Sequence, residues 1–243
     1  GALILTQLYW ICGFLRMSAT GLSAQAKGAG DNSASSQILW QTGLMGFVLG
    51  MGIVLLQKPL LEAGLYLAEA SPSIASAASD YFAIRVWSAP FALVNLALIG
   101  WLVGQQAHRD IMRIQIVANL VNVVLDILLV FVFDFGIAGV AWASVVAELS
   151  IFILAMLRVM QVKGLSFNFH FLQPNRLTNL LALNANMLVR NLALQLCLAF
   201  VTYKGTAMGE LIGSTNAIIL QFFTLIALGL DGLAYATEAL IGE

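Results

Sequence analysis

The sequence has few charged residues and few cysteines. Only 9% of its 243 residues are charged, whereas an ordinary soluble domain has about 25%. Eleven Lys and Arg stand against twelve Asp and Glu, which gives a net charge of -1 and no basic tail or patch for nucleic acid. Cys12 and Cys197 lie far apart inside apolar runs. Neither a disulfide framework nor a CxxC metal site is therefore expected.

Hydrophobic residues dominate the chain instead. They make up 60% of it, and the mean hydropathy is +0.92. This composition predicts a polytopic membrane protein of the all-α class, because a helix satisfies its own backbone hydrogen bonds in lipid. Seven apolar runs are long enough to be spans, at residues 2–25, 38–57, 81–104, 111–133, 137–158, 177–203 and 209–237. Pro90 should bend the third span, and residues 59–70 are too short to cross and should lie at the interface.

The distribution of basic residues predicts the orientation. Six follow the first, third and fifth spans and two follow the second and sixth, so the first group of loops should be cytoplasmic. The six are Lys27, Arg109, Arg113, Arg158, Lys163 and Arg176, and the two are Lys58 and Lys204. Gly1 would then lie outside, directly at a helix start and without an initiating Met. We therefore expect residues before Gly1.

The fourth span carries a polar stripe. Gln115, Asn119, Asn122 and Asp126 follow one another at steps of four, three and four, which places them on one helical face. A carboxylate near the middle of a membrane is costly, so Asp126 is a functional candidate, with Asn122 one turn away as its hydrogen-bond partner. The alternative is a packing contact between helices.

Two later spans have comparable polar faces, which together predict a polar cavity between helices. The seventh span contributes Gln221, Thr224, Asp231, Tyr235 and Glu238, and the sixth contributes Asn184, Asn191, Gln195 and Thr202. Asp231 is the deeper of the two acids. Glu238 lies near the cytoplasmic end, where it is as well explained by contact with solvent.

Three arginines lie within spans. Arg16, Arg85 and Arg190 have long stems that can reach a headgroup, so we expect structural anchoring rather than substrate binding. Ser144 and Glu148 share a face of the fifth span. We expect the Ser144 hydroxyl to bond its own backbone unless it serves a site, and we place Glu148 near the cytoplasmic end.

Small residues recur at helical spacing, and the sequence has no cluster of catalytic groups. GxxxG spacings at Gly46 and Gly50, and at Gly100 and Gly104, predict close helix packing. No nucleophile, base and orienting group cluster in the sequence, and no phosphate-binding loop occurs. His108 and His170 are too isolated for a metal site. An enzyme, a bound metal or an organic cofactor is not expected.

Several segments resemble one transporter family. FLRMSATGLSAQAKGAGD at 14–31 resembles the second helix of the multidrug and toxic compound extrusion (MATE) transporters, in the form of the DinF-like branch. The resemblance covers essentially the whole chain. It continues through IRVWSAPF at 84–91, NVVLD at 122–126, GIAGVAWASVVAE at 136–148, LVRNLALQLC at 188–197 and LDGLAYATEALIG at 230–242.

The resemblance implies an architecture of two facing six-helix lobes, of which this chain would hold helices two to eight of twelve. Residues 1–160 would form most of the amino-terminal lobe, 161–176 the cytoplasmic loop between lobes, and 177–243 the start of the carboxy-terminal lobe. We expect one helix before Gly1 and about four after Glu243. The similar helix ends at Gln25 and Glu243, 218 residues apart, agree with such a repeat.

The resemblance also implies a function and a site. Relatives export amphiphilic, often cationic compounds in exchange for H⁺ or Na⁺ by alternating access, as multi-pass proteins of the inner (plasma) membrane. Asn122 and Asp126 match the family's coupling pair, Ser144 stands where Thr is expected, and Tyr81 matches a nearby fourth-helix Tyr. The family's first-helix Asp has no counterpart in this chain. The cavity that receives the substrate would be lined by Asp231, Tyr235, Glu238, Asn184, Asn191 and Gln195. The expected partners are a small amphiphilic substrate and the bilayer, with no nucleic acid and a monomeric state.

Other functions remain open at this stage. A related lipid-linked oligosaccharide flippase would need a strongly cationic central cavity, which Arg16, Arg85 and Arg190 keep possible. An intramembrane enzyme would need a nucleophile or a ligand set at depth. A membrane scaffold without transport activity would not need stripes of acids.

Overall fold

The computed structural model describes residues 2–67, 72–162, 164–166, 174–207 and 210–241, and all of its regular elements are helices. The all-α expectation is therefore confirmed for the part of the chain described. The α-helices are α1 (Ala2–Ile11), α2 (Phe14–Gly28), α3 (Asn32–Leu55), α4 (Gln57–Leu67), α5 (Pro72–Arg85), α6 (Ala89–Gly104), α7 (His108–Ile127), α8 (Gly136–Met160), α9 (Pro174–Ala207) and α10 (Glu210–Ile241).

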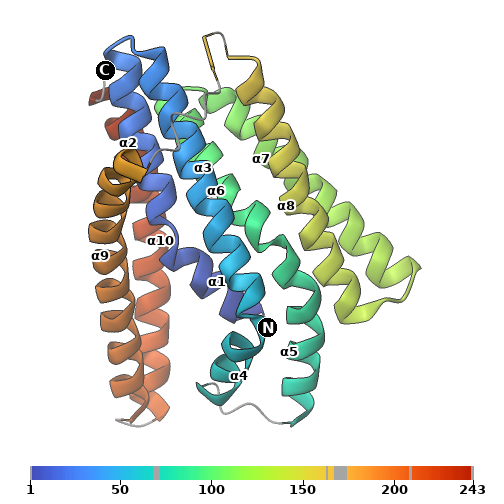
Figure 1. The fold of residues 1–243 in the computed structure, drawn as a ribbon. Helices are drawn as coiled ribbons and strands as arrows, with labels where there is room; N and C mark the ends of the chain where they lie inside the picture. Colours follow the sequence, from blue (N-terminus) through green and yellow to red (C-terminus); the bar gives the residue numbers. More distant parts are fainter. Residues whose placement is uncertain (1, 68–71, 163, 167–173, 208–209, 242–243) are drawn as a thin grey trace.

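Helix α6 lies at the centre of the bundle (Figure 1). It packs against α2, α3 and α8. Within the segment Ala75–Gly104, 83% of an 18-residue apolar stretch is buried inside the protein. The corresponding fractions are 11% for His108–Val132 and 17% for Gly136–Met160. The α7–α8 pair therefore lies at the periphery of the bundle. Helices α9 and α10 lie side by side next to α2 (Figure 1).

Five described helices are long and apolar enough to cross a membrane. They are Asn32–Leu55, Ala75–Gly104, His108–Val132, Gly136–Met160 and Asn184–Thr202. They correspond to the second to sixth predicted spans. A shorter apolar stretch, Ile218–Ala234, lies within the seventh.

The prediction of one unbroken first span over 2–25 is wrong. The helix stops at Ile11 and restarts at Phe14, with a turn at Cys12 and Gly13 between them. The backbone N–H of Gly13 bonds the carbonyl of Trp10, a contact typical of a helix end. Glycine is a weak helix former because it loses the most backbone entropy on folding. The break therefore falls at the residue that favours helix least.

Pro90 marks a second break, as expected. A 3₁₀ turn, Val86–Ser88, separates α5 from α6, and Pro90 occupies the first turn of α6. Proline lacks the N–H that would continue the helix and clashes with the carbonyl four residues earlier. The long apolar segment is therefore two helices joined at a bend.

Glycines allow the central helices to approach one another closely, which confirms the expectation from the GxxxG spacings. A Cβ added at Gly50 would lie 2.4 Å from Pro90 Cα, and one at Gly46 would lie 2.7 Å from the Leu93 carbonyl oxygen. On the other side of α6, a Cβ at Gly100 would lie 2.5 Å from the Arg16 carbonyl oxygen. Helices α2, α3 and α6 are thus packed with backbone against backbone.

Three loops meet at one end of the bundle. Gln105 Nε2 donates to Ser23 Oγ and Ser35 Oγ, each at 2.9 Å, which joins the end of α6 to α2 and α3. The Ser166 N–H donates to Ser36 Oγ at 3.1 Å, so the segment after α8 also lies there. The loops after the first, third and fifth predicted spans therefore lie on the same side, as the count of basic residues requires.

Which side that is can be measured by labelling. We expect single cysteines at the exposed positions Asn32, His108 and Ser166 to be inaccessible to an impermeant thiol reagent in intact cells and to react after permeabilisation. A cysteine at Asp134, exposed in the turn between α7 and α8, is the matched control and should react from outside. External labelling at the first three positions would reverse the predicted orientation.

Candidate functional site

A polar cavity of about 190 Å³ lies among α1, α2, α6, α7 and α8. Most of the surrounding helix surface is apolar, so polar groups placed here must find partners or water. Its lining residues are Tyr9, Arg16, Ala92, Asn95, Leu96, Ile99, Gln115, Glu148 and Ile151.

Glu148, which lines this cavity, forms an ion pair with Arg85. Arg85 Nη2 lies 3.2 Å from Glu148 Oε1, and the two side chains are only 13% and 22% exposed. Asn95 Nδ2 donates to Glu148 Oε2 at 3.0 Å and to the Glu148 carbonyl at 2.9 Å. Arg85 Nη1 also donates to Ser88 Oγ, and the guanidinium lies 6.0 Å from the centre of the Tyr9 ring. Both carboxylate oxygens of Glu148 are therefore bonded.

This ion pair corrects two expectations from the sequence. Arg85 does not extend to a headgroup as an anchor, and Glu148 lies midway along α8 rather than near its cytoplasmic end. The two residues are 63 positions apart on different helices. Helical periodicity shows which residues share a face but not which faces meet.

The predicted coupling residues Asn122 and Asp126 lie on α7 and are half-buried. Asp126 Oδ1 is buried and has no hydrogen-bond partner, so the bond expected from Asn122 is not made at this oxygen. An unpartnered buried oxygen is costly and rare. The expected interior stripe is only partly interior, because Gln115 lines the cavity whereas Asn119 is exposed.

Ser144 and Tyr81, the other two predicted coupling residues, are half-buried near the ion pair. Ser144 precedes Glu148 by one turn of α8, and Tyr81 precedes Arg85 by one turn of α5. Helix α5 packs against α8, and each of the two residues lies one turn from a member of the ion pair. The structure thus brings these two predicted residues to the same region of the lobe.

The residues predicted for the substrate cavity lie on α9 and α10. Asn184 is buried and its Oδ1 accepts a hydrogen bond from Ser18 Oγ at 2.8 Å, which links α9 to α2. Asn191 and Gln195 are half-buried farther along α9. Asp231, Tyr235 and Glu238 lie on α10, and their side chains are outside the described part of the structure, so their roles stay predictions.

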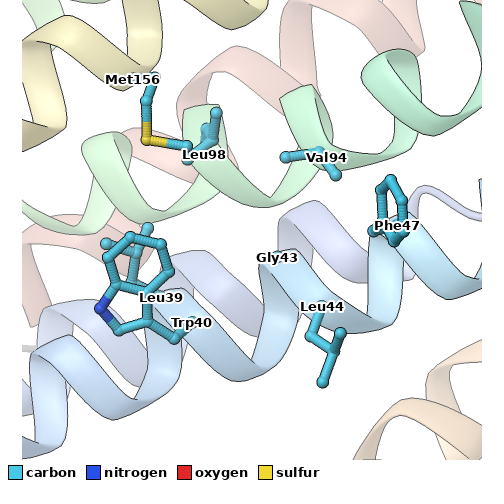
Figure 2. A pocket seen from close by; sticks show the side chains of 8 residues that line it. All are labelled: Leu39, Trp40, Gly43, Leu44, Phe47, Val94, Leu98 and Met156. Atoms are coloured by element: carbon cyan, nitrogen blue, oxygen red, sulfur yellow. The ribbon is translucent and has the colours of Figure 1, made fainter. Parts of the chain in front are cut away.

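A second hollow has a different character. An apolar groove of about 300 Å³ lies between α3, α6 and α8, and Figure 2 shows Val94, Leu98 and Met156 on the side opposite α3. The α3 side of its lining consists of Leu39, Trp40, Gly43, Leu44 and Phe47. None of these residues titrates or binds a cation through a carboxylate. The groove is therefore separate in chemistry from the polar cavity.

Sequence reasoning missed Asn95 and Tyr9 as parts of the site. Asn95 is 5% exposed, and the signal that could have revealed it is a single amide within the apolar run of α6. No group of three or more His, Cys, Asp or Glu side chains that could hold a metal occurs among the described residues.

The comparisons with known proteins agree with this fold. The MatE family profile matches residues 1–128. DNA damage-inducible protein F of Escherichia coli (strain K12) is 36% identical over 247 residues, which cover 100% of this chain and 54% of that protein. Protein DETOXIFICATION 43 of Arabidopsis thaliana is 30% identical over 202 residues, with 82% and 38% covered. The chain spans about half or less of the length of these relatives.

Solved structures show the same fold. A crystal structure of MATE in the bent conformation superposes with a TM-score of 0.84 at 16% identity, covering 98% of this chain and 54% of that one. An outward-facing multidrug resistance MATE family transporter of the MOP superfamily gives 0.82 at 16% identity, with 99% and 55% covered. The fold and the polar interior define a multi-pass membrane helix bundle. The chain belongs to the MatE family, as the sequence resemblance implied.

Proposed function

We propose that this protein is a secondary active transporter that exports amphiphilic, often cationic compounds in exchange for H⁺ or Na⁺ by alternating access. The observation that carries this proposal is Asp126, a half-buried carboxylate on a membrane-spanning helix with one buried oxygen that has no partner. Such a group is costly unless a proton or cation joins it. Membership of the MatE family supports the same function.

The proposed mechanism couples ion binding at Asp126 to the geometry of the two lobes. A carboxylate withdrawn from water binds a proton or cation more tightly than one in solvent. If the two lobe geometries differ in how far they expose Asp126, the ion favours one of them, and its release favours the other. In this scheme Asn122, Ser144 and Tyr81 assist at the ion site. Asn184, Asn191, Gln195, Asp231, Tyr235 and Glu238 line the substrate path.

Membership of the MatE family supports the lobe arrangement that we propose. Residues 1–160 belong to the amino-terminal lobe, 161–176 to the cytoplasmic connection and 177–243 to the carboxy-terminal lobe, and the protein acts as a monomer in the inner (plasma) membrane. Apolar walls supply affinity for varied substrates, and a few polar groups orient them. No organic cofactor takes part.

The flippase alternative is less well supported. Its pyrophosphate substrate would need a strongly cationic cavity. Of the three arginines, Arg16 lines the polar cavity, but Arg85 is neutralised by Glu148 and Arg190 is exposed on α9. A membrane scaffold would have no use for a buried carboxylate without a partner. Antiport therefore accounts for more of the observed polar groups than either alternative.

Flux into proteoliposomes tests the function. We expect the purified full-length protein, as its gene encodes it, to move ethidium when a pH or Na⁺ gradient is imposed and to move little without one. The matched control is the same vesicle preparation with the gradient collapsed by an ionophore. Equal flux with and without both gradients would contradict antiport.

A further inference from the structure

The polar cavity has a hydrogen-bond acceptor that is not used by the contacts around the Arg85–Glu148 ion pair. Asn95 is 5% exposed and its Nδ2 donates two hydrogen bonds to Glu148. Its Oδ1 is buried without a partner at the cavity. The cavity of about 190 Å³ has room for several waters, since each occupies about 30 Å³ in the liquid. A water there can donate to Asn95 Oδ1 and reach the Glu148 carboxylate.

The position of Glu148 relative to Asp126 is the second observation. Gln115 lines the cavity together with Glu148, and the polar residues Asn119 and Asn122 lie between Gln115 and Asp126 on α7. They recur about once per turn on one face, over an axial distance of about 16 Å at 1.5 Å per residue. Gln115 at the cavity and Asp126 thus lie on one face of α7, with Asn122 half-buried and Asn119 exposed between them.

The order of Asp126 and Glu148 across the membrane agrees with the predicted orientation. Helix α8 runs from the turn at Asp134 toward the end where Gln105 and Ser166 meet α2 and α3. Asp126 is only eight residues from the turn at Asp134, whereas Glu148 is 14 residues from it, so Glu148 lies nearer to the opposite end, which the basic residues predict to be cytoplasmic. A proton that leaves Asp126 for the cytoplasm would meet Glu148 on the way.

The surroundings of Glu148 can support both of its charge states. The titratable and charged groups around it are Arg85 and Tyr81 from α5, Arg16 from α2 and Tyr9 from α1, while α6 and α7 present the amides Asn95 and Gln115. Arg85 balances the carboxylate when it is charged, and Arg16 lines the same cavity. When Glu148 is neutral, Arg85 keeps its bond to Ser88 Oγ and its position at the Tyr9 ring.

We propose that Glu148 is a second proton-binding carboxylate, placed on the cytoplasmic side of Asp126, and that its protonation breaks the ion pair with Arg85. The proposal rests on the transport function above. The proton passes from a cavity water to a carboxylate oxygen of Glu148, Arg85 stays a guanidinium, and the reverse step returns the proton to water. The ion pair ties α8 to α5, and Asn95 ties it to α6. Loss of the ion pair removes the charged link between α8 and α5 beside the bend at Pro90, while the bond from Asn95 to the Glu148 carbonyl remains.

The test separates a proton carrier from a structural ion pair. In proteoliposomes with the full-length protein, Glu148→Gln keeps the shape and the acceptor for Asn95 but cannot gain and lose a proton. The double variant Arg85→Gln and Glu148→Gln also removes the unpaired charge that the single variant leaves. We expect both to bind ethidium but to move fewer protons per ethidium than the wild type, and Glu148→Asp to retain part of the coupling.

The matched control is another ion pair on α8. Arg158 Nε lies 2.5 Å from Asp110 Oδ2 near the end of the helix, and it joins α8 to α7. The double variant Asp110→Asn and Arg158→Gln should keep the wild-type ratio of protons to ethidium. If the Arg85→Gln and Glu148→Gln double variant also keeps that ratio, Glu148 is a structural partner only and the proposal is overturned.

A second measurement does not depend on transport. Infrared difference spectra of the purified protein between high and low pH report the C=O band of each carboxyl that takes up a proton. We expect one band that Glu148→Gln removes and Asp126→Asn leaves in place. If no band depends on Glu148, the proposal fails even when transport is normal; if the band is present but no gradient drives flux, the proposed function fails instead.

Discussion

Asp126→Asn is expected to abolish gradient-driven export by the full-length protein while the protein still inserts and binds its substrate. Asparagine has nearly the shape of aspartate but cannot change its charge, so the ion no longer selects between lobe geometries. In the proposed mechanism an ion joins the buried Oδ1 that has no partner, and the amide cannot take that ion. The measurement is ethidium flux into proteoliposomes under a pH or Na⁺ gradient, with binding followed separately by fluorescence.

The control for this variant is the next carboxylate along the chain. Asp134 is exposed in the turn before α8 and has a φ of 56°, a conformation that asparagine adopts readily. Asp134→Asn should leave flux unchanged. Ser144→Ala should reduce flux less than Asp126→Asn, because water can replace a hydroxyl in a hydrated cavity. If Asp126→Asn transports at the wild-type rate, Asp126 is not the coupling carboxylate, and Asp231 becomes the next candidate.

Gly50→Ala is expected to destabilise the bundle strongly for so small a change. The added methyl would lie 2.4 Å from Pro90 Cα and 2.8 Å from the Ala89 carbonyl oxygen, both backbone atoms that no side-chain rotation can move away. Overpacking of this kind costs about 1–3 kcal/mol. We expect a lower unfolding temperature in detergent, measured by loss of the monodisperse peak after heating.

Gly52, two residues away on the same helix, provides the matched control. A Cβ there would meet nothing within 4 Å, so Gly52→Ala gains about 1 kcal/mol of helix propensity without a clash. The difference between the two variants isolates the contact of α3 with α6. Equal unfolding temperatures would show that the two helices separate at little cost.

Much of the fold could be predicted from the sequence because it depends on local patterns. Apolar runs located the helices, Pro90 located the bend before α6, and the GxxxG spacings located the close contacts at Gly46, Gly50 and Gly100. The break at Gly13 was missed, because a single glycine inside an apolar run is often tolerated within a helix and does not by itself mark a helix end.

The site was predicted less completely, for a physical reason. Asp126 could be found because any carboxylate in an apolar run is conspicuous, and the shared face of Ser144 and Glu148 follows from helical spacing. The partners of Glu148 could not be found, because Arg85 and Asn95 reach it from other helices. Which faces meet depends on how the helices pack.

The glycine contacts of α6 have a consequence for biogenesis. A helix that enters the membrane during synthesis can pack only against helices that entered before it. The two helices that contact α6 through glycines, α2 at Gly100 and α3 at Gly46 and Gly50, precede it in the chain. Helices α2, α3 and α6 can therefore assemble in the lipid before the synthesis of α7 and α8 is complete. The α7–α8 pair then packs against the assembled helices.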